Sequence, residues 1–461
     1  MATRVLTEWT PEDNAFWERQ GKAIATRNLW ISIPALLLAF AVWMVWSVVV
    51  VNLPNIGFKF STDELFWLAA LPGLSGATLR IFYSFMVPIF GGRRWTAIST
   101  ASLLLPALGI GYAVQDPSTP YATFLILALL CGFGGGNFAS SMSNISFFFP
   151  KAQKGMALGL NAGLGNLGVS VMQFAVPLVI TAGVFGALGG DPQTWAKGEQ
   201  TRNMWLQNAG FIWVPFILAA TVAAWFGMDD LASAKASFAE QSIIFRRKHN
   251  WLMCWLYLGT FGSFIGYSAG FPLLIKSQFP DINPTQYAFL GPLVGALARP
   301  LGGWVADKLG GASVTFWNFI VMAGAVFGVL AFLPHNHVGG DFWGFFAMFM
   351  LLFATTGIGN GSTFRMIPVI FLTERQRAAA GRGAEAEAQA VKDANKEAAA
   401  VLGFSSAFAA YGAFFIPKSY GTSIAMTGGP EAALYVFIVF YVSCIAMTWW
   451  YYSRKNAEMP C

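Results

Sequence analysis

The sequence has few charged residues, few cysteines and few histidines, and each shortage excludes a class of protein. Charged residues make up 11% of the 461 positions, against about 25% in a soluble domain, so an ordinary soluble protein is excluded. The four cysteines form neither a disulfide framework nor a metal-ligand spacing. We find no phosphate-binding loop with its lysine and no nucleophile with a partnered base. The sequence therefore predicts no enzyme, no cofactor and no metal site.

Apolar residues dominate the chain. Hydrophobic residues account for 56% of it, including 43 phenylalanines, and no stretch alternates as a barrel strand would. The expected fold class is an all-α membrane protein with twelve transmembrane helices, since a helix of about 20 apolar residues spans a bilayer. The predicted spans are residues 28–53, 62–90, 95–114, 121–149, 155–184, 205–227, 251–276, 284–306, 312–333, 342–371, 399–417 and 431–453.

Basic residues are distributed unevenly between the segments that connect these spans. With a cytoplasmic amino terminus, twenty of the 28 Lys and Arg residues fall in cytoplasmic segments and five face outward. The positive-inside rule then predicts that both termini are cytoplasmic. The acidic amino-terminal segment lacks the shape of a cleaved signal peptide, so the first helix is expected to stay in the mature chain. The net charge of +6 reflects this topology, and no nucleic-acid partner is expected.

The polar stretch 228–250 divides the spans into two similar sets of six. GGNFASSMSNISFFF (135–149) aligns with IGNGSTFRMIPVIF (358–371), and ALGLNAGLGNLG (157–168) aligns with VLGFSSAFAAYG (401–412). Two parallel six-helix halves are the organisation of a rocker-type transporter, whose substrate site lies at the midplane. We predict an amino-terminal bundle (1–227), a cytoplasmic linker (228–250) and a carboxyl-terminal bundle (251–461). Residues 373–398, rich in Ala, Glu and Lys, are expected to form a helical cytoplasmic insertion.

Two arginines interrupt the apolar spans at equivalent positions. Arg80 and Arg299 each stand eleven residues before a Gly-Gly pair, which puts both guanidinium groups roughly 16 Å deep in a hydrocarbon core of about 30 Å. None of the 22 Asp and Glu residues lies deep within a predicted span, so no acidic partner is expected. Because a guanidinium presents coplanar N–H donors, the pair favours a small flat oxyanion.

The scarcity of titratable residues in the spans also concerns the mechanism. Proton-driven transporters relay protons through intramembrane Asp, Glu or His, whereas His249 is expected in the central loop and His335 and His337 in an outward loop. An empty site would leave two cations in low dielectric, each at a cost of about 3 kcal/mol or more. This favours obligate exchange of anions. Proton symport remains an alternative, as does an anion sensor whose output is the 373–398 insertion.

Two loop motifs and a glycine-rich span are candidates for gating and packing. GGWVADKLGG (302–311) follows the eighth span, and its Asp307 is expected to form a cytoplasmic ion pair that latches one state. The pattern resembles the loop motif of the major facilitator superfamily, although Pro88 takes the place of the acidic residue in the first half. Gly163, Gly165 and Gly168 of NAGLGNLG would let neighbouring helices approach closely.

The segment 132–173 closely resembles the signature of bacterial nitrate/nitrite porters. TFGSFIGYSAGF (260–271), FMVPIFGGRRW (85–95) and IGNGSTFRMIPVIF do so too, and the likeness to the NarK-type branch covers essentially the whole chain. The resemblance implies twelve helices and exchange of nitrate for nitrite across the bacterial cytoplasmic membrane, with nitrate taken in and nitrite released. The expected partners are these anions and membrane lipid, and the protein is expected to be a monomer. It also implies a site in which two arginines hold the anion between aromatic rings. The corresponding residues are Arg80, Arg299, Phe138, Phe261, Tyr257, Asn166 and Ser406.

Two positions depart from the pattern of these porters. Ala162 stands where relatives carry a second glycine, and Arg365 stands where some carry glutamine. Since Arg365 lies about seven residues from the cytoplasmic end of its span, we expect its side chain to reach the surface rather than the site.

Overall fold

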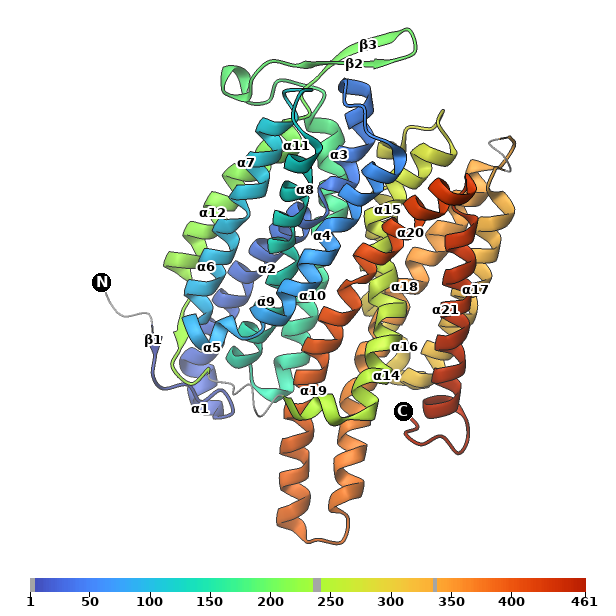
Figure 1. Ribbon diagram of the computed structural model, residues 1–461. Coiled ribbons are helices and arrows are strands. Elements are labelled where there is room, and N and C mark those ends of the chain that lie inside the picture. The colour runs from blue at the N-terminus through green and yellow to red at the C-terminus, as the bar shows by residue number, and fades with distance from the viewer. Residues whose placement is uncertain (1–4, 235–241, 335–337) are drawn as a thin grey trace. The chain divides into compact units, whose positions relative to one another are not determined.

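The computed structural model describes residues 5–234, 242–334 and 338–461, and it is mostly helical (Figure 1). Within these residues, twelve helical segments are long and apolar enough to cross a membrane, and each overlaps one of the predicted spans. The predicted fold class is therefore confirmed. The segments are Asn14–Ile56, Thr62–Tyr83, Gly92–Ala113, Tyr121–Phe148, Lys151–Val179, Asn208–Gly227, Lys248–Gln278, Pro284–Leu309, Gly311–Phe332, Phe342–Ala379, Ala384–Thr427 and Glu431–Ser453.

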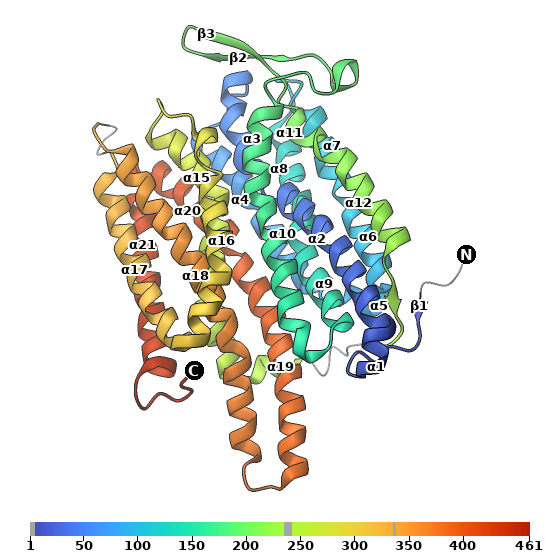
Figure 2. The ribbon, with the colours of Figure 1, turned by 180° about the vertical axis from the view of Figure 1, so that it is seen from behind.

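The helices fall into two compact units, and the first contains the first six spans. It comprises Met1–Lys235, Gly266–Leu293 and Ala413–Met426. In this unit α2, α9 and α10 lie side by side (Figure 2). Its helices in the amino-terminal half are α1 (Asn14–Phe16), α2 (Lys22–Met44), α3 (Trp46–Asn52), α4 (Thr62–Tyr83), α5 (Met86–Phe90), α6 (Gly92–Ser102), α7 (Leu104–Ala113), α8 (Tyr121–Leu130), α9 (Gly132–Phe148), α10 (Lys151–Val179), α11 (Asn208–Phe211) and α12 (Trp213–Gly227).

Two helices from later in the sequence pack largely within this first unit. They are α15 (Ser263–Gln278) and α20 (Gly412–Thr427). On α15, the backbone carbonyl of Ser268 accepts a hydrogen bond from Gln173 Nε2 at 2.8 Å. On α20, Lys418 Nζ donates to Asp63 Oδ1 at 2.8 Å. The compact units thus cut across the sequence halves, and the boundaries 1–227 and 251–461 remain a prediction.

Two short strand pairs also belong to the first unit, and neither was predicted. β1 (Val5–Leu6) runs parallel to β4 (Asp230–Leu231), while β2 (Gln193–Lys197) and β3 (Gln200–Met204) form an antiparallel hairpin. The hairpin turns at Gly198, which has φ +60° and suits a two-residue loop. Trp195 lies opposite Arg202, whose guanidinium carbon is 4.1 Å from the centre of the indole ring. A cation–π contact therefore links the two strands.

The second unit holds most of the carboxyl-terminal half. It comprises Ala236–Ile265, Val294–Gly412 and Thr427–Cys461. The insertion 373–398 is helical, as expected. It consists of the end of α18 and the start of α19, which lie side by side and are joined by a turn at residues 380–383. The helices are α14 (Lys248–Tyr257), α16 (Leu290–Leu309), α17 (Gly311–Phe332), α18 (Phe342–Ala379), α19 (Ala384–Ala410) and α21 (Glu431–Thr448).

Acidic residues at the ends of the spans serve as helix caps. Ser61 Oγ accepts from the backbone N–H of Glu64 at 3.2 Å, and Glu64 Oε2 accepts from the N–H of Ser61 at 2.7 Å, which makes a capping box at the start of α4. Asp341 caps α18 in a similar way, through the N–H groups of Trp343 and Gly344. These carboxylates stabilise helix starts and are not partners for a buried arginine.

Candidate functional site

Arg80 is a fully buried arginine near the end of α4, and three aromatic rings lie around it. Its Nε donates a hydrogen bond to the carbonyl oxygen of Gly135 on α9 at 2.7 Å. The guanidinium carbon lies 4.6 Å from the ring centre of Phe138, 5.0 Å from Trp43 and 6.0 Å from Phe40. The predicted neighbours Arg80 and Phe138 are therefore brought together in one cluster.

Glycines determine how closely α4 and α9 approach each other beside Arg80. A Cβ at Gly135 would lie 2.7 Å from the Cα of Gly76, and a Cβ at Gly132 would lie 2.7 Å from the Gly76 nitrogen. Such distances leave no room for a side chain, so the small residues in this part of the segment serve close packing. The close approach presents the Gly135 carbonyl to Arg80.

Phe40 and Trp43 complete this cluster, and neither was among the predicted site residues. Both lie on α2, three residues apart, and both are fully buried. An aromatic residue in an apolar span has the same local pattern as any other core residue. The only signal for these two is their separation of about one helical turn, which places both on the same face of α2.

Arg299 lies on α16 in the second unit and has a partly unsatisfied guanidinium. Its Nη1 is buried and has no hydrogen-bond partner among the residues that the structure describes. No carboxylate in the described part of the chain lies within ion-pair distance of it. The guanidinium carbon is 5.4 Å from the ring centre of Phe364 on α18. A buried donor without a partner costs free energy that a bound anion would recover.

The predicted residues Tyr257 and Phe261 lie within a chain of rings that includes Phe364. Tyr257 and Phe261 stack with centres 5.6 Å apart and planes at 21°, and the Tyr257 ring is 6.3 Å from that of Phe364. Phe261 belongs to a π-helical turn, Leu258–Gly262, a feature often found at functional sites. Phe364 was missed for the same reason as Phe40, although it directly precedes Arg365.

Asn166 and Ser406 are buried polar residues in spans. Asn166 on α10 is 1% exposed, and its Oδ1 has no hydrogen-bond partner within the described residues. Ser406 on α19 donates from Oγ to the carbonyl oxygen of Gly403 at 2.9 Å. Their part in substrate binding remains a prediction.

Two of the three predicted packing glycines lie where α10 meets α2. A Cβ at Gly168 would lie 2.1 Å from the carbonyl oxygen of Leu37, and a Cβ at Gly165 would lie 2.7 Å from the Leu36 side chain. A Cβ at Gly163 would have no described neighbour within 4 Å. Close packing therefore accounts for Gly165 and Gly168 but not for Gly163, whose gating role stays a prediction.

Asp307 and Arg365 form an ion pair in the second unit. Nε of Arg365 on α18 donates to Oδ1 of Asp307 on α16, and 40% of the Arg365 side chain is exposed. Asp307 thus has the kind of basic partner that the loop motif predicted. Arg365 belongs to this pair rather than to the cluster around Arg299.

The first half obtains the equivalent carboxylate from elsewhere in the chain. Asp230, in β4 after the sixth span, accepts hydrogen bonds from the backbone N–H of Arg93 at 2.8 Å and from its Nε at 3.2 Å. A Cβ at Gly91 would lie 2.4 Å from Asp230 Oδ1, so this glycine leaves the carboxylate room. Asp230 was missed, and its only signal was an Asp-Asp pair directly after the sixth span.

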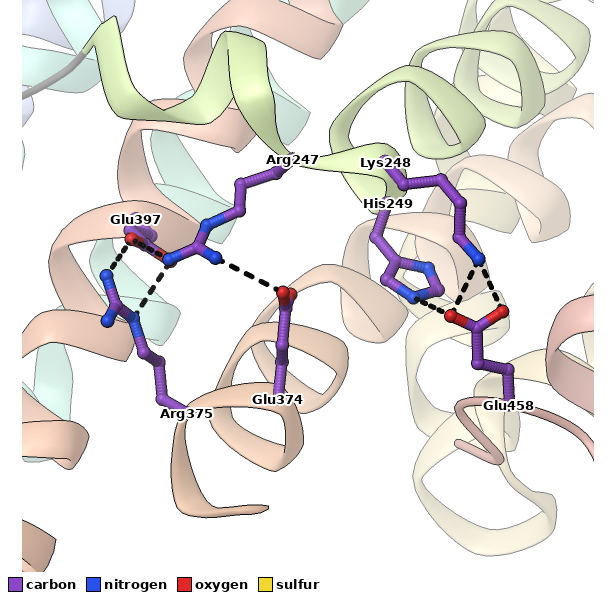
Figure 3. A network of polar contacts seen from close by, with 7 residues as sticks. All are labelled: Arg247, Lys248, His249, Glu374, Arg375, Glu397 and Glu458. Carbon is purple, nitrogen blue, oxygen red and sulfur yellow. Dashed lines mark hydrogen bonds and ion pairs between the residues drawn. The ribbon is translucent and has the colours of Figure 1, made fainter. Parts of the chain in front are cut away.

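Charged residues at the base of the insertion form a network with the start of α14 (Figure 3). Arg247 contacts Glu397 at 3.0 Å and Glu374 at 3.4 Å, and Arg375 also bonds Glu397. Lys248 Nζ donates to both oxygens of Glu458, which lowers the pKa of that carboxyl group.

His249 belongs to this network, because its Nε2 lies 3.5 Å from Glu458 Oε1 (Figure 3), and its position corrects one expectation. It was expected in the central loop, but it is buried in the first turn of α14, where Nδ1 lies 2.9 Å from the Tyr452 hydroxyl oxygen. The helix begins at Lys248, three residues before the predicted span 251–276, and therefore includes His249. The other two histidines, His335 and His337, lie outside the described residues.

Twelve spans with a ring-lined arginine in each compact unit define the class as a polytopic membrane transporter. Residues 35–384 match the family model described as Major Facilitator Superfamily. The chain is 56% identical to the nitrate/nitrite transporter NarU of Escherichia coli (strain K12), over 98% of this chain and 97% of the relative. It is 44% identical to the probable nitrate/nitrite antiporter NarK2 of Thermus thermophilus, over 99% and 98% of the two chains.

A solved structure shares the fold at much lower sequence identity. It is a bacterial homolog of the human lysosomal transporter Spinster, in an inward-facing and occupied conformation, with a TM-score of 0.61 and 14% identity over 91% of this chain and 95% of that one. The chain therefore belongs to the major facilitator superfamily and, within it, to the NarK-type nitrate/nitrite porters.

Proposed function

We propose that this protein transports nitrate and nitrite, taking nitrate in and releasing nitrite by alternating access. The observation that carries the proposal is an arginine against aromatic rings in each compact unit: Arg80 with Phe138, and Arg299 with Phe364. Relatives named as nitrate/nitrite transporters and antiporters match over nearly the full length. No catalytic role is proposed.

The surroundings of Arg80 restrict how it would hold an anion. Because Nε donates to Gly135, a bidentate contact would use the edge formed by the two Nη groups. Aromatic faces on either side would admit a flat ion such as nitrate or nitrite and exclude a tetrahedral one such as sulfate. Asn166, with its buried carbonyl oxygen, and Ser406 would add polar contacts.

Obligate exchange follows from the cost of an empty site. Arg299 has a buried Nη1 without a hydrogen-bond partner in the described chain, and no carboxylate there to neutralise it. Switching with an empty site would carry an uncompensated cation through a low-dielectric environment, at a cost of several kcal/mol. Switching with a bound anion would avoid that cost. The carrier therefore returns only when it is loaded, which gives one-for-one exchange.

The proposal includes an orientation and a moving unit. Both termini and the 373–398 insertion face the cytoplasm of a bacterial cell, as the distribution of Lys and Arg predicts. The amino-terminal bundle, 1–227, and the carboxyl-terminal bundle, 251–461, rock about a midplane site. The partners are the two anions and the surrounding lipid, with no nucleic acid, and the protein acts as a monomer.

Counterflow in proteoliposomes tests this function. Vesicles are loaded with nitrite, nitrate, chloride or no permeant anion, and uptake of isotopically labelled external nitrate is followed. We expect rapid uptake only into vesicles that contain nitrite or nitrate. Robust uptake under an imposed pH gradient into vesicles that contain only chloride or no permeant anion would refute obligate exchange in favour of proton symport. Absence of uptake in every condition would refute nitrate transport.

A further inference from the structure

Trp43 on α2 forms a hydrogen bond to α4, the helix that bears Arg80. Its Nε1 donates a hydrogen bond of 2.6 Å to the carbonyl oxygen of Pro72 in α4. Proline lacks an N–H, so α4 lacks a backbone hydrogen bond at this turn and is free to bend there. Pro72 precedes Arg80 by about two turns of helix. The contact from Trp43 therefore fixes α4 at the point that determines where Arg80 projects.

The indole of Trp43 occupies a slot that only glycine permits. A Cβ at Gly76 would lie 2.4 Å from Trp43 Nε1, and a Cβ at Gly135 would lie 2.6 Å from Cε2 of the same ring. The slot thus lies between α4 and α9, and the ring is completely buried in it. A side chain enclosed in this way has a single orientation.

The face of this fixed ring meets the guanidinium of Arg80. The guanidinium carbon is 5.0 Å from the indole centre, within the range of a cation–π contact, and tryptophan is the strongest partner for such contacts. Phe40 packs against Trp43 at 5.6 Å and 64°, and against Phe138 at 6.0 Å and 88°. The three rings therefore form a cluster in which Trp43 is also hydrogen-bonded to the helix that bears the arginine.

We propose that Trp43 is a positioning residue for anion binding: its indole face orients the Arg80 guanidinium so that its Nη edge receives the substrate. This inference rests on the proposed transport of nitrate. Trp43 acts through Arg80 and does not touch the anion. Weakening the π face should therefore raise the KM for nitrate more than it lowers the maximal rate.

Fluorinated tryptophans test this without changing the shape of the ring. Mono-, di-, tri- and tetrafluorotryptophan are introduced at position 43 by nonsense suppression, and nitrate/nitrite exchange is measured in proteoliposomes. Fluorine withdraws electron density from the ring face but does not weaken the N–H donor to Pro72. We expect KM to rise stepwise, by about tenfold at four fluorines, with a maximal rate that changes less than twofold. Trp43→Phe, which lacks the N–H donor, serves as a conventional second variant, for which we expect a raised KM.

Trp46 supplies the matched control. It is also fully buried, lies one turn further along the chain in α3, and packs against Phe124 at 5.7 Å. The same substitutions at Trp46 should leave the KM unchanged. A flat series at Trp43, or an equal rise at both positions, overturns the inference while wild-type exchange persists. Wild-type vesicles that exchange no nitrate overturn the proposed function itself.

Discussion

The Nε of Arg80 donates a 2.7 Å hydrogen bond to the carbonyl oxygen of Gly135, so the backbone of α9 holds a side chain of α4 in place. An arginine at this position can donate from Nε to the Gly135 carbonyl and from its Nη groups to an anion at the same time. A lysine has a single ammonium group, which offers an anion only a point charge and cannot make both contacts in this way.

Conservative replacement of either buried arginine should therefore abolish most transport. We expect Arg80→Lys and Arg299→Lys each to lower nitrate exchange in proteoliposomes by at least about tenfold, since each loses a charge-assisted bidentate contact. Arg202→Lys, in the β2–β3 hairpin, is the matched control and should exchange normally. Near-normal exchange by either of the first two variants would contradict bidentate recognition.

Adding one methyl group at Gly135 should destabilise the helix packing around Arg80. In Gly135→Ala the new Cβ would lie 2.6 Å from Trp43 and 2.7 Å from Gly76, and such overpacking costs about 1–3 kcal/mol. Thermal unfolding of the purified protein should show a lower Tm. In Gly324→Ala, on α17, the new Cβ would have no neighbour within 4 Å beyond its own stretch of helix among the described residues, and this variant should retain the wild-type Tm. Equal Tm values for the two variants would contradict the tight α4–α9 contact.

The two carboxylates that pair with arginines beside the loop motifs, Asp230 and the predicted Asp307, should contribute differently to the free energy of unfolding. The Asp230 side chain is 7% exposed and bonds both the backbone and the guanidinium of Arg93, whereas that of Asp307 is 63% exposed. Asp230→Asn should cost about 3 kcal/mol, because it leaves a shielded guanidinium poorly neutralised. Asp307→Asn should cost less than about 1 kcal/mol. Parallel melting curves measure the difference, and a reversed order would refute this assignment.

The pH dependence of stability should contain a contribution from Glu458. Its pKa is lowered by the hydrogen bond from Lys248. A carboxyl group whose pKa is lower in the folded state contributes stability above its unfolded pKa and loses it as the pH falls through the folded pKa. Melting curves between pH 5 and 3 should therefore show a loss that Glu458→Gln lacks. The side chain is 44% exposed, so the difference should stay below about 1 kcal/mol. Identical pH profiles of stability for the wild type and Glu458→Gln would contradict this contribution from Glu458.

Removing the tip of the insertion separates a transporter from a sensor. Residues 379–393 are replaced by a short Gly-Ser linker that keeps Arg375 and Glu397 in the network of Figure 3. Nitrate exchange should stay within about twofold of wild type, because exposed helix tips tolerate such changes. As a control, Glu397→Gln removes the carboxylate shared by Arg247 and Arg375 and should lower the Tm. Loss of exchange in the deletion variant, with an unchanged Tm, would favour an output role for the insertion.

The spans were predictable because each is a long apolar run, and the arginines because a charge inside such a run is conspicuous. The rings of Phe40, Trp43 and Phe364 were not, since a functional aromatic residue and a core aromatic residue have the same local pattern. Phe138 was named only through a family motif. The role of such a ring depends on which side chain of another helix lies beside it. The periodicity of one helix does not contain that information, because it comes from how the helices pack together.

Long-range pairing explains the other differences. Asp230 pairs with Arg93 over 137 residues of sequence. The first loop motif has Pro88 in place of its acidic residue, and the loop alone gives no sign that Asp230 supplies the carboxylate. The β2–β3 hairpin lies in a connection between spans, where polar residues mask a short alternation. In both cases the partner, rather than the local sequence, decides the structure.

The origin of the Asp230 carboxylate has a consequence for biosynthesis. The loop after the second span is translated more than a hundred residues before the acidic group that secures it. While the ribosome is still making spans three to six, Arg93 must rely on water or lipid phosphate for a counter-charge. The amino-terminal bundle can therefore form this ion pair only after its sixth helix has been inserted. A chain truncated just before residue 229 would contain all six helices but would lack the carboxylate that pairs with Arg93.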